Sequence, residues 1–198
     1  MSAHHHVEHA EHTEHVAHSN KNVALLIAVI ALFLALSETL GKSAQTAAIS
    51  YNVEASNLWA FYQAKTIRQT VLNTAAETRL FDARLLTDPA LKADIQKQIE
   101  AWRATVARYE SEPKPTGGEG RRELSARALE AQKKQETAMA RYHHYELASA
   151  AFQIGIVLCS AAVVTTMIVL AYIAAGLGVV GLAFTGIGLF APQAVHLF

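Results

Sequence analysis

Residues 23–36 read VALLIAVIALFLAL, an apolar run that contains no charged side chain. With residues 37–40, which extend it, the run supplies about the 20 helical residues needed to cross a bilayer core of ~30 Å. A second apolar block is longer, because no Asp, Glu, Lys or Arg occurs from Leu147 to Phe198. Charge segregated into blocks indicates two solvents, so the sequence predicts an all-α integral membrane protein with a first transmembrane helix at 22–41.

The long apolar block predicts a C-terminal pair of transmembrane helices at 148–174 and 178–197. Gly176 and Gly178 fall at the junction, where backbone freedom suits a tight turn between antiparallel spans. Pro192 weakens the last segment, so a re-entrant or interfacial segment is the alternative to a full span.

Small residues inside this block have the spacing of close helix packing. Gly155 with Cys159, and Gly181 with Thr185, are separated by three residues, as in small-xxx-small motifs. Cys159 is the only cysteine and cannot form an intramolecular disulfide, so we expect it to be a packing residue.

The charged residues between the apolar blocks, 42–147, predict a coiled-coil-like helical hairpin. Helices are expected at about 42–86, 89–111 and 120–147, with a helix start at Thr87-Asp88-Pro89 and a break at Pro113–Gly118. At ~1.5 Å per residue the first helix is roughly 67 Å long, and neither of the others can match it alone. The second and third helices should therefore return along the first, end to end.

Three apolar stripes with steps of three or four residues predict the seam of the hairpin. On the first helix the stripe comprises Ala64, Ile67, Val71, Thr74, Thr78, Phe81 and Leu85. On the second it comprises Leu91, Ile95, Ile99, Trp102, Val106 and Tyr109. On the third it comprises Leu124, Ala128, Ala131, Gln135, Ala138, Tyr142 and Tyr145. A two-helix hairpin buries little area per residue, so we expect neighbouring chains to complete the burial in a homo-oligomer.

The N-terminal residues, 1–21, form a tail rich in histidine and glutamate that we expect to be flexible. Its seven histidines are His4, His5, His6, His9, His12, His15 and His18. Imidazole and carboxylate suit Zn²⁺ or another divalent metal, and imidazole also gains charge near pH 6.5. A metal- or pH-responsive tail is one hypothesis, and a solvated, mobile tail that binds metal only incidentally, with no cofactor, is the other.

Basic residues are more frequent on the hairpin side of the apolar segments than before the first one. Lys21 alone precedes the first span, whereas Lys42, Arg127, Lys133, Lys134 and Arg141 lie near the ends of the hairpin. The positive-inside rule therefore predicts a cytoplasmic hairpin. Glu38, the one charge within 22–41, is expected at the membrane interface beside Lys42 at i+4, with a proton-relay role as the alternative.

The stretch from Ala55 to Arg68, ASNLWAFYQAKTIR, resembles the WAYYQAKSI-type signature of a bacterial membrane family known as domain of unknown function 4337 (DUF4337). The histidine-rich tail, the first apolar run and the C-terminal apolar pair are also similar to that family. The resemblance covers nearly the whole chain. It implies a multi-pass protein of the bacterial inner membrane to which no activity is assigned.

Aromatic and polar residues of this motif are the candidate interaction residues. Trp59, Phe61 and Tyr62 are interpreted as packing anchors, as is Trp102 on the second helix. The alternative is a binding patch in which Gln63, Lys65 and Arg68 contact an anionic partner.

Composition excludes several function classes. Lys plus Arg and Asp plus Glu both number 17, so the chain lacks the basic surplus of a nucleic-acid-binding protein. No activated nucleophile, carboxylate pair or phosphate-binding loop is present, so we expect neither catalytic residues nor an enzyme. The sequence favours a structural or scaffolding oligomer that associates with itself or recruits a protein partner through its hairpin. The alternatives are a metal- or pH-responsive protein and a small channel or transporter subunit.

Overall fold

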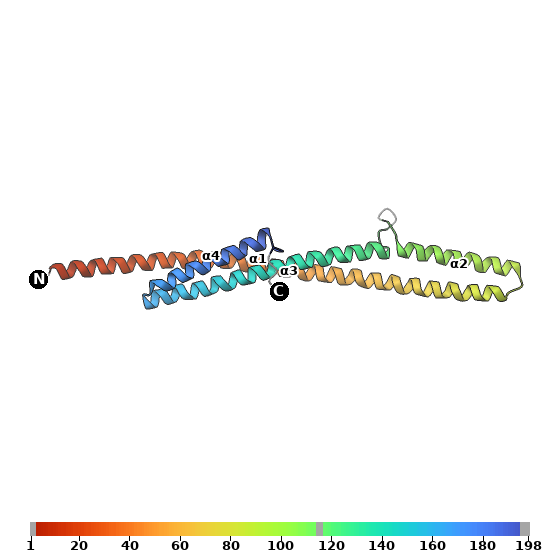
Figure 1. The fold of residues 1–198 in the computed structure, drawn as a ribbon, viewed down its shortest axis with the longest axis horizontal. Coiled ribbons are helices and arrows are strands. Elements are labelled where there is room, and N and C mark those ends of the chain that lie inside the picture. The colour runs from red at the N-terminus through yellow and green to blue at the C-terminus, as the bar shows by residue number, and fades with distance from the viewer. Residues whose placement is uncertain (1–2, 114–116, 195–198) are drawn as a thin grey trace. The chain divides into compact units, whose positions relative to one another are not determined.

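The computed structural model describes the backbone of residues 3–113 and 117–194, and the side chains of these ranges from Lys21 onward. Within them the chain forms four helices and no strand (Figure 1). They are α1 (Ala3–Leu85), α2 (Pro89–Glu110), α3 (Arg121–Thr165) and α4 (Ile168–Phe190). The predicted all-α class is confirmed.

The four helices contribute to two compact units, which are described separately. The apolar unit comprises Met1–Ala48 and Glu136–Phe198, and the hairpin unit comprises Ile49–Gln135. α1 and α3 each contribute to both units, whereas α4 belongs to the apolar unit and α2 to the hairpin unit. Helices α1, α3 and α4 are long and apolar enough to cross a membrane.

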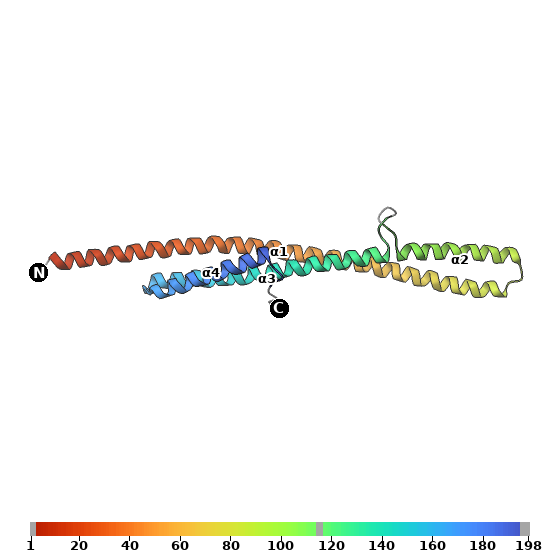
Figure 2. The same cartoon turned by 45° about the horizontal axis from the view of Figure 1, so that its top comes forward.

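In the hairpin unit, α2 and the start of α3 together pack against one stretch of α1. Asp88 caps α2 by accepting a hydrogen bond from the Ala90 amide at 2.8 Å, and Pro89 occupies the first turn. Figures 1 and 2 both show α2 lying beside the last part of α1. Beyond α2, Leu124 of α3 shares a buried cluster with Leu58 of α1. The predicted end-to-end return along α1 is confirmed.

The α1 stripe that packs in this unit is not the one predicted from apolarity. We call it the inner seam, and its members are Tyr51, Ala55, Leu58, Tyr62, Lys65, Gln69, Leu72 and Ala76, all buried or half-buried. The predicted α1 stripe is wrong, because Ile67, Val71, Phe81 and Leu85 are exposed. The α2 stripe is buried or half-buried as predicted, except for the exposed Leu91. The α3 stripe is also buried or half-buried, but Ala138, Tyr142 and Tyr145 belong to the apolar unit rather than to the hairpin unit.

The apolar unit packs α1, α3 and α4 around Ile30, Phe152 and Cys159. Cys159 is fully buried, as predicted. The small residues bring the helices close together. Gly155 approaches the Ala174 carbonyl oxygen, and a Cβ added at Gly181 would lie 2.6 Å from the Phe152 ring. The predicted role of small residues in this block is therefore confirmed.

The turn between the last two helices lies at Thr166 and Met167, so the prediction at Gly176 and Gly178 is wrong. Both glycines lie inside α4, and Gly178 packs against Ile30. Thr166 adopts a left-handed φ of 56°, and Thr165 Oγ1 bonds back to the Ala161 carbonyl.

The prediction relied on the backbone freedom of glycine, whereas the turn occurs at residues that fit poorly in a helix. Four consecutive β-branched residues occupy Val163–Thr166, and α3 ends within them. As a result α3 ends before the predicted boundary at 174, and α4 occupies 168–190 rather than 178–197. Pro192 follows the end of α4.

Candidate functional site

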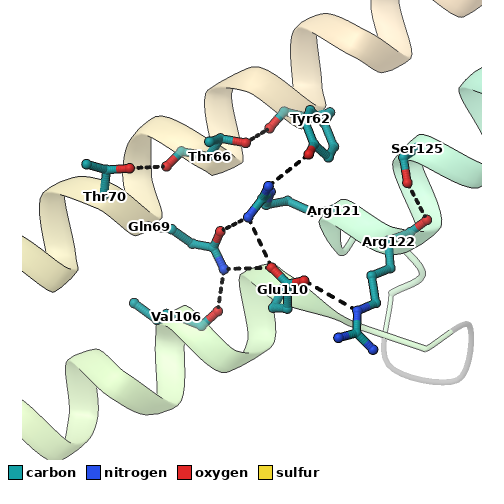
Figure 3. Close-up of polar contacts among 9 residues, drawn as sticks. All are labelled: Tyr62, Thr66, Gln69, Thr70, Val106, Glu110, Arg121, Arg122 and Ser125. Carbon is teal, nitrogen blue, oxygen red and sulfur yellow. Dashed lines mark hydrogen bonds and ion pairs between the residues drawn. The ribbon is translucent and has the colours of Figure 1, made fainter.

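The most extensive set of polar contacts described in the chain surrounds Arg121, where α2 ends and α3 begins (Figure 3). Its guanidinium donates to Gln69 Oε1 at 2.6 Å, to Glu110 Oε2 at 3.1 Å and to the Tyr62 hydroxyl at 2.8 Å. The same group lies over the Tyr62 ring, 4.8 Å from its centroid. Arg121 thereby links α2 and the start of α3, which together form the returning arm of the hairpin, to α1.

We call this set the polar cluster, and its members are Tyr62, Gln69, Glu110, Arg121 and Arg122. Both polar atoms of the Gln69 side-chain amide form hydrogen bonds in it. The Nε2 of Gln69 donates to the Val106 carbonyl at 3.0 Å and to Glu110 Oε2 at 3.3 Å. Gln69 is only 7% exposed, so its carbonyl oxygen depends on Arg121 for a donor. The exposed side chain of Arg122 donates to the other oxygen of Glu110, Oε1, at 3.3 Å.

A second group of contacts fastens the connection between α2 and α3. Lys65 Nζ lies 3.8 Å from Glu112 and 5.6 Å from the centroid of the Tyr109 ring. Glu123 accepts hydrogen bonds from the Ser111 hydroxyl at 2.7 Å and from the Glu112 amide at 3.2 Å. These contacts tie the α2 end of the connection to α1 and to the first turn of α3.

Electrostatics in these contacts favour the ionised carboxylates. The hydrogen bond from Gln69 lowers the pKa of Glu110, and the positive charge of Arg121 lowers it further. The hydrogen bond from Ser111 lowers the pKa of Glu123. Carboxylates stabilised as anions are poor proton acceptors, so this arrangement suits holding helices together rather than acid–base chemistry.

The predicted interaction residues do not share one surface. Trp59 and Tyr62 are half-buried with rings edge to face, 5.4 Å apart, and Trp59 packs against the buried α1–α3 cluster. Phe61 is exposed, so packing within the chain does not explain it. Trp102 is half-buried on α2.

Of the residues proposed to meet an anionic partner, Lys65 points to Glu112, whereas Gln63 and Arg68 are exposed. Gln69, Glu110 and Arg121 were not singled out from the sequence. The available signal was the spacing of Lys65 and Gln69, which continue the three-four steps of Ala55, Leu58 and Tyr62.

Polar side chains also meet inside the apolar unit. Ser37 is fully buried and shares a hydrogen bond of 2.9 Å with Thr185. His144 is 1% exposed, and its Nε2 donates to the Pro192 carbonyl at 3.1 Å. Glu38 accepts from Gln153 Nε2 at 3.2 Å instead of pairing with Lys42 as expected. These contacts join α1 to α3 and α4, and α3 to the end of α4.

The predicted metal-binding histidines, from His4 to His18, lie outside the residues whose side chains are described. Among the described side chains, no group of three or more His, Cys, Asp or Glu is placed to hold a metal ion.

The fold and these contacts define an all-helical protein with three membrane-length helices and a hairpin fastened by a polar cluster. The chain belongs to the family described as Domain of unknown function (DUF4337), whose model matches residues 19–191. The family resemblance drawn from the Trp59-containing motif is therefore confirmed. Comparisons with curated proteins and with solved structures gave no match.

Proposed function

We propose that this protein is a multi-pass protein of the bacterial inner membrane with a structural, non-catalytic role. Its hairpin unit associates with a second copy or recruits a protein partner on the cytoplasmic side. The membrane part of the proposal is supported by three apolar helices, of which α4 alone is about 35 Å long for its 23 residues.

The observation that carries the proposal is the contrast between the two kinds of side chain in the hairpin unit. Its polar residues near the α2–α3 connection are paired with one another, as Lys65 is with Glu112 and Arg121 with Glu110. Large apolar side chains such as Phe61, Ile67 and Phe81 are instead exposed. Such exposed apolar residues mark a binding surface rather than a reaction site.

Native mass spectrometry of the full chain extracted in mild detergent tests the proposal. We expect a complex of two or more chains, with or without a second protein, recovered from the membrane fraction. A monomer that binds no protein, or a chain recovered in the soluble fraction, would contradict it.

The repeated histidines of the tail favour a metal- or pH-responsive role as the second candidate. Deleting residues 1–20 from the full chain separates the two functions. Unchanged assembly supports the structural role, and loss of a zinc-dependent phenotype supports the second candidate. Calorimetric titration of the intact protein with Zn²⁺, against the deletion variant, measures the affinity directly.

Labelling tests the proposed orientation. The exposed Glu119 lies in the α2–α3 connection, so a Glu119→Cys variant in a Cys159→Ala background reports where the hairpin lies. An impermeant maleimide should label it in inverted vesicles and not in intact spheroplasts. The opposite pattern would place the hairpin outside.

A further inference from the structure

A second stripe runs along α1 in the hairpin unit, and we call it the outer stripe. Its members are Val53, Asn57, Ala60, Ala64, Ile67, Val71, Thr74, Thr78, Phe81 and Leu85. Consecutive members are separated alternately by four and three residues, and none is charged. Its five large apolar side chains are between 52% and 73% exposed. The most apolar stripe of this segment is therefore the one that the chain leaves uncovered.

The outer stripe lies on the face of α1 opposite the inner seam. Each inner position is followed two residues later by an outer one, as Tyr62 is by Ala64 and Lys65 by Ile67. Two residues correspond to about 200° of rotation around an α-helix. One helix thus carries two seven-residue repeats back to back, and the returning arm covers only one of them.

We propose that the outer stripe is the contact surface for a second copy of this chain, with the two α1 helices parallel and in register. This inference rests on the proposed function, because two copies inserted in one membrane in the same orientation present α1 in the same direction. The stripe is narrow and keeps the 3.5-residue period of a helix–helix seam.

Flanking charges favour a protein partner over a lipid surface. Glu54 and Arg68 flank the stripe on one side, and Glu77 and Arg84 flank it on the other. Helices that lie on membranes carry an excess of Lys and Arg beside the apolar face. Charges of both signs, present here, instead suit a helix of the same kind.

The polar members of the outer stripe are compatible with a helix dimer. Asn57 precedes Ala60 by three residues, which places it at the a position of the repeat, where one asparagine specifies register and two-stranded pairing. Thr78 donates its hydroxyl hydrogen to the Thr74 carbonyl at 2.9 Å, so this polar group needs no partner on a second chain.

The area available is sufficient for a membrane-confined dimer. From Val53 to Leu85 the stripe is about 48 Å long, and a helix about 10 Å wide covers roughly 500 Å² of it on each copy. The total of about 1,000 Å² lies at the lower bound for a specific interface. Anchoring in one bilayer raises the effective concentration of the two copies, which strengthens so small a contact.

Disulfide cross-linking of the full chain in native membranes tests the proposal. Cys159→Ala removes the only native thiol, and Ile67→Cys introduces one in the centre of the outer stripe. Asn73→Cys, exposed on the same helix but off the stripe, and Lys97→Cys on α2 are the matched controls. With copper phenanthroline as oxidant we expect a covalent dimer from Ile67→Cys at several times the yield of either control.

Two outcomes overturn the inference. Equal yields from Ile67→Cys and the controls, in a protein that native mass spectrometry shows to be oligomeric, would assign association to another face and leave the proposed function standing. A monomer that binds no protein would remove both.

A charge substitution supplies an independent measurement. Ile67→Glu should shift the extracted protein toward monomer at least tenfold in the dimer dissociation constant, whereas Asn73→Glu should not. Both positions are exposed, so circular dichroism should show unchanged helicity in each variant. A dimer unaffected by Ile67→Glu would contradict the proposal. So would a monomeric protein in which added lipid vesicles protect the cysteine of Ile67→Cys from thiol labelling.

Discussion

Replacing Arg121 by methionine removes the central donor of the polar cluster and keeps an unbranched side chain. Three hydrogen bonds are lost, to Tyr62, Gln69 and Glu110. The largest effect should come from Gln69, whose buried carbonyl oxygen loses the Arg121 donor. Such an orphaned group costs about 1–3 kcal/mol.

The remaining losses are smaller and do not add fully to the first. Glu110 is 41% exposed at its side chain, so water replaces much of what Arg121 supplied. We expect local opening of the joint between α2 and α3 to become easier by about 2 kcal/mol, or roughly 30-fold in the opening equilibrium.

Hydrogen exchange measured by mass spectrometry on the full chain in detergent would detect this change. Amides at the end of α2 and the start of α3 should exchange faster in Arg121→Met, whereas amides of α4 should not. Arg122→Met is the matched control, because the Arg122 side chain is 74% exposed and its described contact is the ion pair with Glu110. Equal exchange in the two variants would refute the argument that Arg121 holds the joint.

Three further changes have expected signs. Gly181→Ala should destabilise the apolar unit by about 1–3 kcal/mol, because the new Cβ meets the Phe152 ring. Gly176→Ala, whose new Cβ would have no neighbouring side chain within 4 Å, should be neutral or stabilising. Equal thermal midpoints of the two variants in detergent would contradict this. Thr166→Gly should raise the free energy of unfolding by about 1 kcal/mol, and with it the thermal midpoint, because glycine adopts the positive φ without strain. A lowered midpoint would be inconsistent with that turn. The pKa of Glu110 is lowered from 4.5 in the folded chain. Its contribution to the free energy of unfolding should therefore be complete above pH 4.5 and be lost as the pH falls through the lowered value. Glu110→Gln should weaken this acid dependence of the thermal midpoint.

Much of the fold follows from local signals in the sequence. Asp88 and Pro89 define the start of α2 because capping and a fixed φ act within a few residues. The apolar runs predict helices that can cross a membrane, because the length and composition of a segment alone decide whether it can do so.

Partners distant in the sequence explain what local signals missed. Lys65 and Gln69 occupy the inner seam because Glu112, the Val106 carbonyl and Arg121 satisfy them. A prediction from apolar periodicity favours the more apolar stripe of a helix as the packed one. It therefore chose the stripe that contains Ile67 and Phe81 instead of the partly polar inner seam. The same limit applies to the polar cluster, whose members come from three helices and have no common motif.

Two opposite faces of α1 with the same seven-residue repeat restrict how the hairpin can change in length during evolution. Inserting or deleting one residue within 53–76 would rotate every later position by about 100°, and both stripes would lose their alignment at once. Homologous hairpins should therefore differ in multiples of seven residues along this arm, with equal changes in the arm that returns.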